Sequence, residues 1–529
     1  MERDRCYWTT YGGGHKMREQ FYPVFNVVTG LNVDAAADTI ADTDTPDAKD
    51  VWYYNRMIQA RPGLNSSPYQ NFNNFVVGMY QYTRMSGESY MVTATTKYIY
   101  KWNTITGVWN KLNPGATSFS GSDLTIGDFT TFVDELIFTN GADPIFAWDG
   151  LAATGGDLAC DYKAEFCLTH ANHLCLGFTY EGGGRFPQRV RWSDAGDATV
   201  WSGADSGGLN LVEKPDWITG MELLGNYWVV FKQKSIVLMS FVGGPFSYNQ
   251  RTAVTDVGNI APKSIVDDGR GSLLFFSGDD FCVFRGGTEA PGIGSDRIKG
   301  IIRNFSNDKM QKIAGMHIPE YNIILWAVPE GRTATTNQTI LCYSTIYKSW
   351  ATWQMPSAVH VTGFGTLRET EEDVSIDSIS TPIKDCDRAI DKAFYLSQRP
   401  TYLISGVTGG VYNIMDINQK TDFGQYMQAY WTSKWFWLKD ATLNKEVVFI
   451  YLHVIPQDDG YMYVDLASDF NETYAKTKKV HLKVTGTEHR IKVDMRLSGQ
   501  CFRLRFRQDK DTRFQVIGFN VAYTIRGER

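Results

Sequence analysis

Four residues that commonly bind transition metals lie close together within residues 167–175. Cys167, His170, His173 and Cys175 form a C-x2-H-x2-H-x-C cluster. A structural zinc site needs such ligands to converge as a tetrahedron, usually from turns. Here His173 and Cys175 begin the apolar run HLCLGF, which is typical of a β-strand, and neighbouring side chains of a strand point to opposite faces. We therefore expect buried thiols and ordinary histidines here, with no metal ligands.

A second segment, residues 193–201, invites comparison with the Asp-box, a turn motif of sialidase propellers. That motif places its Asp two positions and its Gly four positions after a Ser. Here Asp194 and Gly196 fall one and three positions after Ser193, so the motif does not match. The glycine run 182–184 lies between two expected strands and no helix follows it, which argues against a phosphate-binding loop.

No catalytic group can be chosen from the sequence. Glycoside hydrolysis needs a pair of carboxylates roughly 5–10 Å apart, and the chain offers 58 Asp and Glu residues without marking any pair. No His-x-Glu, Gly-x-Ser-x-Gly, Walker or Gly-x-Gly-x-x-Gly motif stands in a suitable context. We therefore expect no enzyme, no catalytic or cofactor-binding residues and no cofactor.

The elements that would position any site repeat along the chain. Short apolar or alternating runs, each followed by a turn and a second strand, start at Tyr90, Glu135, His173, Tyr227, Ser272, Ile323 and Tyr402. Most of the intervals are close to the roughly 40–50 residues of a four-stranded propeller blade. The spacing predicts an all-β fold with a β-propeller of about six to seven blades, some of them irregular. A continuous array of β-sandwiches is the alternative with similar spacing.

Large aromatic residues follow the turns of several repeats. Trp192, Trp350 and Trp353 end strands or turns of the expected blades. A Trp at such a place buries a large apolar face against a neighbouring element. We expect these three residues to pack between blades.

Changes in composition and in the hydrophobic pattern divide the chain into three parts. Residues 1–50 have few core residues and are expected to form an extended arm and loop. Residues 51–418 carry the propeller repeats, with an acidic insertion at about 366–396 that we interpret as a solvated surface excursion. Residues 419–529 contain longer alternating runs, such as Cys501–Arg507 with one apolar and one basic face. This pattern predicts an antiparallel β-sandwich platform.

Composition and charge exclude several classes of protein. Aromatic residues make up 14% of the 529 residues, with 49 Gly and 17 Pro, which favours packed sheets over long helices. The chain has a net charge of −6, whereas proteins that bind nucleic acid usually carry an excess of basic residues. No stretch resembles a signal peptide or membrane span. Most of the eight cysteines are therefore expected to be reduced, buried thiols.

Several segments, in order over roughly residues 25–415, resemble those of the nozzle proteins of short-tailed bacteriophages, also called tail tubular or tail hub proteins. They are Gly30-Leu31-Asn32 with Arg61-Pro62-Gly63, Arg189–Ser193 with Gly196, Asp197 and Trp201, Asp256–Gly258 with Ala261–Ser264 and Leu274–Asp279, and Tyr343–Trp353. In that family, the segment at Arg61 opens the first propeller strand. The Asp-rich residues 34–50 and the acidic insertion near residue 370 depart from the family pattern.

The resemblance implies a structural role in the virion rather than chemistry. It implies a hexameric ring in the phage tail, below the portal and adaptor, made in the host cytoplasm. Its expected partners are other copies of the chain, the adaptor or head-to-tail connector protein, and tail fibre or tailspike proteins. Genomic DNA would be retained and then ejected through the channel without specific binding. The alternative is a propeller enzyme or adhesin acting on host-surface polysaccharide.

The expected ring contacts lie in the C-terminal sandwich, from about residue 420 to 529. Its long alternating strands offer edges that a neighbour can pair with. We expect the basic residues Arg503, Arg505 and Arg507 to face acidic segments of a neighbour, such as Glu369–Asp373 or Asp38–Asp47.

Overall fold

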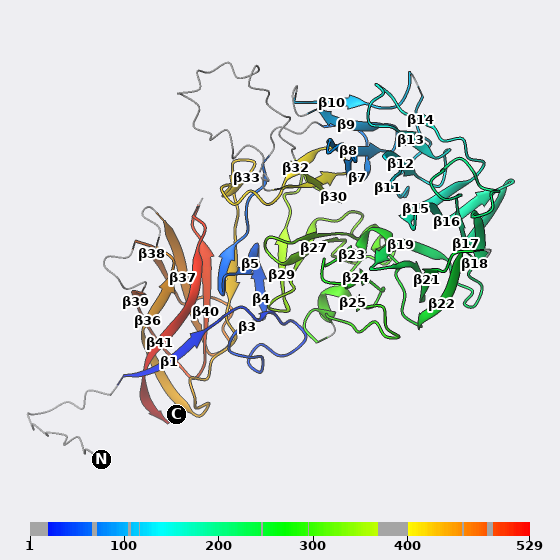
Figure 1. The fold of residues 1–529 in the computed structure, drawn as a ribbon. Coiled ribbons are helices and arrows are strands. Elements are labelled where there is room, and N and C mark those ends of the chain that lie inside the picture. Colours follow the sequence, from blue (N-terminus) through cyan, green and yellow to red (C-terminus); the bar gives the residue numbers. More distant parts are fainter. Residues whose placement is uncertain are drawn as a thin grey trace, which may run out of the picture.

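The computed structural model describes most of the chain. The described residues are 19–65, 71–103, 107–115, 117–244, 247–294, 296–368, 400–456, 460–483, 490–510 and 512–528. They form a β-propeller and an antiparallel β-sandwich, which lie side by side in Figure 1. No helix within these ranges is long and apolar enough to span a membrane.

Seven antiparallel sheets follow one another along the propeller, and each is one blade. The first four blades have four strands each: β7 (Val76–Thr83), β8 (Ser89–Thr95), β9 (Ile99–Asn103) and β10 (Val108–Lys111); β11 (Asp128–Phe132), β12 (Glu135–Thr139), β13 (Phe146–Trp148) and β14 (Gly156–Asp157); β15 (Lys163–His170), β16 (His173–Glu181), β17 (Gly184–Trp192) and β18 (Gly207–Asn210); β19 (Ile218–Leu224), β20 (Tyr227–Lys232), β21 (Ser235–Phe241) and β22 (Tyr248–Thr255).

The remaining blades are less regular. They are formed by β23 (Val266–Asp267), β24 (Leu273–Phe276) and β25 (Phe281–Phe284); β26 (Ala314–Ile318), β27 (Ile323–Val328), β28 (Thr339–Ser344) and β29 (Ser349–Gln354); and β30 (Val361–Leu367), β31 (Thr401–Gly406) and β32 (Val411–Asn413). Within the described residues, three short helices lie in the connections: η1 (Pro262–Ser264), α1 (Lys299–Ile302) and η2 (Met310–Lys312). The blade count falls within the predicted range of six to seven.

The first strand of each blade faces the propeller axis, and these inner strands form a closed ring. β11 contacts β7 and β15, β15 contacts β19, and η1 lies between β19 and β26. β30 of the last blade packs against both β26 and β7, so the last blade meets the first. The predicted propeller is confirmed, and the seven predicted repeats correspond to the second strands of the blades, β8, β12, β16, β20, β24, β27 and β31.

The sandwich has two antiparallel sheets, as predicted. One has the strand order β39-β36-β41-β6-β5, with β1 also paired to β41, and the other has the order β38-β37-β40-β35-β4. The strands are β1 (Gln20–Phe25), β4 (Asp47–Lys49), β5 (Val51–Tyr54), β6 (Met57–Ala60), β35 (Tyr430–Thr432), β36 (Leu443–Val454), β37 (Tyr461–Ser468), β38 (Lys476–His481), β39 (Arg490–Gly499), β40 (Phe502–Gln508) and β41 (Gln515–Glu528). Two small two-stranded sheets join β2 (Gly30–Leu31) to β3 (Asp44–Thr45) and β33 (Thr421–Asp422) to β34 (Gln425–Tyr426).

The N-terminal part of the chain differs from the prediction. β1 pairs with β41, β4 pairs with β35, and the hairpin β5–β6 pairs with β41 through β6. Figure 1 shows these blue strands among the orange and red strands of the sandwich. Residues 20–60 therefore belong to the sandwich, and the propeller strands begin at Val76 rather than near residue 51. The partner strands lie more than 380 residues away in sequence, so no local pattern marked the pairing.

A buried ion network joins the N-terminal segment to the start of the C-terminal part. The guanidinium of Arg61, which is fully buried, forms ion pairs with Asp50 (Nε to Oδ1, 2.8 Å) and Asp422 (Nη2 to Oδ2, 2.6 Å). It also donates hydrogen bonds to the carbonyl oxygens of Pro62 and Gln354. The two carboxylates raise the pKa of Arg61 further above its ordinary value, although burial acts to lower it. Residues 61–63 thus close the junction of the two units, well before the first propeller strand.

Gly63 is needed at this junction because two backbones meet there. A Cβ atom on Gly63 would lie 2.1 Å from the carbonyl oxygen of Thr421. Any side chain would therefore push the backbone of β33 away.

Two of the three tryptophans pack between blades, as predicted. Trp192 of β17 lies 4.9 Å from Tyr248 of β22 between ring centroids, and Trp350 of β29 lies 5.4 Å from Phe281 of β25. Trp353 instead faces the sandwich, where its indole Nε1 donates a hydrogen bond to the carbonyl oxygen of Val51 at 2.8 Å. The side chain of Trp353 is fully buried in a hydrophobic core that both units share. Most of the predicted insertion at 366–396 lies outside the described residues.

Candidate functional site: the axial cavities

The cysteine and histidine cluster is not assembled into one site. Cys167 and Cys175 lie in two different hydrophobic clusters of the propeller. His173 donates a hydrogen bond from Nδ1 to the carbonyl oxygen of Ser193 at 2.7 Å, and His170 is bonded to the hydroxyl of Tyr248. Burial raises the pKa of the Cys175 thiol to about 12, so this thiol stays protonated at neutral pH. Within the described ranges, no group of three or more His, Cys, Asp or Glu residues is placed to hold a metal ion.

The segment at 193–201 forms a turn after β17. Asp194 accepts a hydrogen bond from the backbone N–H of Asp205 at 3.0 Å, and Asp197 accepts bonds from the N–H and hydroxyl of Thr199. Both carboxylates therefore hold the local loop in shape, as Asp residues commonly do in turns.

Two cavities lie along the propeller axis. The first has a volume of about 250 Å³ and the second about 540 Å³. Every blade contributes residues to the lining of the second cavity, mainly from its inner strand or from the connection before that strand. Both cavities are lined by Ile126, Phe166, Pro262 and Lys263. These four residues therefore lie at the boundary between the two halves of the axial passage.

Two acidic residues of the second cavity are held in poorly solvated surroundings. Asp128 on β11 accepts a hydrogen bond from the backbone N–H of Cys167 at 2.9 Å, and Glu222 on β19 accepts one from the N–H of Leu223 at 3.0 Å. Burial raises the pKa of each carboxyl group to about 7, with the charge of Glu222 adding to the effect on Asp128. Groups that titrate near neutral pH are found at functional sites and also in structural networks.

Lys263, in η1, is a cation that lines both axial cavities. Its ammonium donates a hydrogen bond to the carbonyl oxygen of Val77. Burial lowers the pKa of Lys263 to about 8, against the opposing effect of the Asp128 charge. Lys263 forms no ion pair within 4.0 Å with any residue that the structure describes, and it lines both axial cavities.

The raised pKa of Glu222 predicts a stability change with pH. The unfolded carboxyl group ionises near pH 4.5 and the folded one near pH 7, so the folded state loses stability as the pH rises between these values. Glu222→Gln keeps the acceptor for Leu223 and removes the charge. We expect this variant to match the parent at pH 4 and to be more stable at pH 8, by up to about 3 kcal/mol.

The measurement is urea unfolding of both proteins at a series of pH values. Glu289→Gln, at an exposed position, is the control and should keep the pH dependence of the parent. Equal stability of Glu222→Gln and the parent at pH 8 would show that the folded protein ionises Glu222 without cost.

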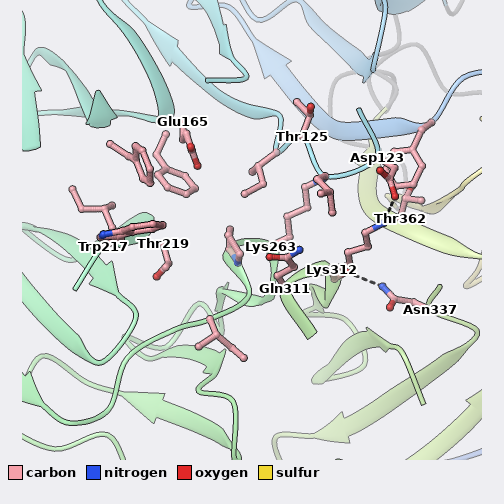
Figure 2. Close-up of a pocket in the computed structure, with 18 of the residues that line it drawn as sticks. Asp123, Thr125, Glu165, Trp217, Thr219, Lys263, Gln311, Lys312, Asn337 and Thr362 are labelled. Atoms are coloured by element: carbon pink, nitrogen blue, oxygen red, sulfur yellow. Dashed lines mark hydrogen bonds and ion pairs between the residues drawn. The ribbon is translucent and has the colours of Figure 1, made fainter. Parts of the chain in front are cut away.

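The first cavity opens where the connections between blades meet. Figure 2 shows Trp217 and Thr219 on one side, Lys312 and Asn337 on the other, and Lys263 and Gln311 between them. Lys312 forms an ion pair with Asp123 at 2.6 Å. None of the patterns in the sequence pointed to this group, because each blade or connection supplies only one or a few of its residues.

Comparisons with known proteins give little beyond the fold. No family model and no curated protein matches the chain. Among solved structures, BamB from Moraxella catarrhalis is 11% identical with a TM-score of 0.35, over 69% of this chain and 89% of that one. The structure of YCF48 bound to D1 peptide is 8% identical with a TM-score of 0.38, over 67% and 98% of the two chains. Scores this low do not support any statement about function.

The charged residues expected to face a neighbour have partners within the chain. On β40, Arg505 and Arg507 form ion pairs with the fully buried carboxylate of Asp465, at 2.9 and 2.5 Å. Asp44 pairs with Arg297 at 2.9 Å. Asp42 and Asp47 are also bonded, to Lys434 and to the hydroxyl of Tyr430. Arg503 donates a hydrogen bond to the carbonyl oxygen of Ser433 at 3.3 Å. Contacts of these side chains with a neighbouring chain stay a prediction, and residues 369–373 lie outside the described part.

Proposed function

We propose that this chain is a structural protein of the virion, the tail nozzle of a short-tailed bacteriophage. In this role, six copies form a ring that extends the DNA channel below the portal and adaptor, retains the genome and permits its ejection. One observation carries the proposal: a closed propeller shares a hydrophobic core with an antiparallel sandwich. The sequence resemblance to nozzle proteins covers the propeller, and the sandwich is compatible with the tube-forming platform of that family.

The charge of the chain supports the same role. A ring that lets DNA pass must not hold it by its phosphates, and the net charge of −6 disfavours such binding. The proposed partners are other copies of the chain, the adaptor, and tail fibre or tailspike proteins. The proposal needs no catalysis.

The exposed edge of the sandwich is the surface that we assign to the ring contact. Strand β1 pairs with β41 and has no second partner strand in the described part of the chain. Two of its side chains, Phe21 and Phe25, remain 47% and 41% exposed. An unpaired strand edge with exposed aromatic residues is a surface that another chain can cover.

Electron microscopy and light scattering of the purified chain test the proposal. We expect a ring with six-fold symmetry, and we expect the double variant Phe21→Asp, Phe25→Asp to shift the protein to single chains. Met85→Asp is the control, because Met85 is 81% exposed at a turn of the first blade, away from β1. The control should still form rings.

Two outcomes would contradict these assignments. A parent protein that stays a single chain at high concentration would argue against the nozzle and favour the enzyme or adhesin alternative. If the double variant still forms rings, the ring contact does not lie at β1. Cutting the chain near residue 418 is a poor test, because the sandwich would lose the strands from residues 20–60 that complete its sheets.

A further inference from the structure

The first axial cavity contains an aromatic ring that is held in place and still accessible. The side chain of Trp217 is 42% exposed, whereas most Trp residues of the described chain are buried. The guanidinium of Arg185 lies over the Trp217 ring at 4.4 Å from its centroid, and over the neighbouring Phe178 ring at 4.6 Å. Stacking of this kind fixes the ring while its other surfaces line the cavity. Trp217 therefore offers a rigid apolar platform to a small ligand.

The polar groups around this platform suit a ligand that carries hydroxyl groups. The lining includes the amide side chains of Gln233 and Gln311, which both donate and accept hydrogen bonds. The hydroxyl of Thr219 donates to the carbonyl oxygen of Asn259, and that of Thr362 is bonded to Ser405, so these two offer mainly acceptor capacity. Glu165 adds carboxylate acceptors, although one of its oxygens already accepts a bond from Tyr180 at 2.8 Å. A cavity with one apolar platform and several such groups fits a molecule with an apolar face and a polar edge.

Lys263 offers a positive charge to a ligand in this cavity. The ammonium of Lys263 has three N–H donors, of which one is used by the carbonyl oxygen of Val77. Two other cations line this cavity: Lys312 of η2 forms an ion pair with Asp123, and Arg185 is stacked on Phe178 and Trp217. An anionic group of a ligand would therefore find a partner at Lys263, through a charge-assisted hydrogen bond.

We propose that the first axial cavity binds one acidic sugar residue of a cell-surface glycan, with the sugar ring against Trp217 and its carboxylate on Lys263. The volume of about 250 Å³ suits a single ring rather than a longer chain, since pockets for drug-sized ligands span roughly 300–1,000 Å³. This site goes beyond the nozzle role and would let each propeller contact the cell envelope. It requires only one folded chain.

The test is titration of the purified protein, followed by ligand-observed NMR, with methyl glycosides of glucuronic acid and N-acetylneuraminic acid. Methyl glucoside is the neutral counterpart and inorganic phosphate is the simple anion. We expect binding of at least one acidic glycoside, with affinity at least about tenfold above that of methyl glucoside. Trp217→Ala should weaken this binding about tenfold or more, and Lys263→Met should abolish the preference for the acidic sugar.

Tyr227→Ala is the matched control, since Tyr227 is an aromatic residue of similar exposure, 43%, outside the cavity lining. It should bind like the parent. The proposal is overturned if neither acidic glycoside binds, if neutral sugar or phosphate alone binds as tightly, or if Trp217→Ala leaves binding unchanged. Trp217 is partly exposed, so its variant is expected to fold even if Lys263→Met does not. Failure of ring formation would not change any of these outcomes.

Discussion

Replacing Arg61 with Met is expected to lower the free energy of unfolding by about 3–5 kcal/mol, the usual cost of removing one partner from a buried ion network. The guanidinium is fully buried and forms ion pairs with both Asp50 and Asp422. Without it, both carboxylates remain out of water with no counter-charge. The segments that they anchor are the N-terminal strands and the start of the C-terminal part, so the junction of the two units should loosen first.

Urea unfolding measures the loss, and limited proteolysis near residues 61–65 and 419–422 reports the junction. Arg526→Met is the control, because Arg526 is an exposed residue of β41 that forms an ion pair with Glu446 of β36; it should cost less than about 1 kcal/mol. Adding Asp50→Asn and Asp422→Asn to Arg61→Met should recover part of the stability. An Arg61→Met protein as stable as the control would show that the two carboxylates are hydrated.

Replacing Trp353 or Trp350 with Ala is expected to cost about 3–5 kcal/mol each, because both side chains are fully buried and a large cavity would remain. The two positions should differ in where the damage appears. Trp350 packs against Phe281 of the preceding blade, whereas Trp353 bonds to the carbonyl oxygen of Val51 in the sandwich. Hydrogen exchange should therefore rise mainly between blades in one variant and at β5 and β6 in the other.

Trp353→Phe separates packing from hydrogen bonding. It keeps most of the apolar volume but leaves the Val51 carbonyl without its donor, which should cost about 1–3 kcal/mol. Trp217→Ala serves as the control for loss of a Trp at a partly exposed site and should melt close to the parent. A Trp353→Ala protein that melts like the parent would contradict its place in the shared core.

The strands with strong local patterns were predictable. The seven apolar runs that mark the propeller are the second strands of its blades, and a strand packed between two neighbouring blades needs apolar side chains on both faces. β40 likewise shows its structure locally, since Phe502, Leu504 and Phe506 are buried and the arginines between them are more exposed. In both cases the burial of successive side chains within one strand determines the pattern of apolar residues, so the strand can be recognised from its own sequence.

The pairing of distant segments could not be predicted in the same way. β1 is a short strand with no neighbouring strand close to it in sequence. Its partner β41 lies almost 500 residues further along the chain. The residues of the arm were expected to stay outside the sandwich because they contain many Asp residues. The structure instead gives Asp44 and Asp50 cationic partners from elsewhere in the chain, which offset the cost of burying their charge.

By itself, the sequence determined an all-β chain with a propeller and a sandwich, because periodic burial of a strand produces a regular pattern of apolar residues in the sequence. Only the tertiary structure decided that the seven blades close into a ring, that residues 20–60 belong to the sandwich, and which residues line the axial cavities. Lys263, Asp128 and Trp217 come from three different blades or connections and line the same axial passage only because the inner strands form a ring around one axis. Such a meeting depends on contacts between distant segments, and no local run of residues carries that information.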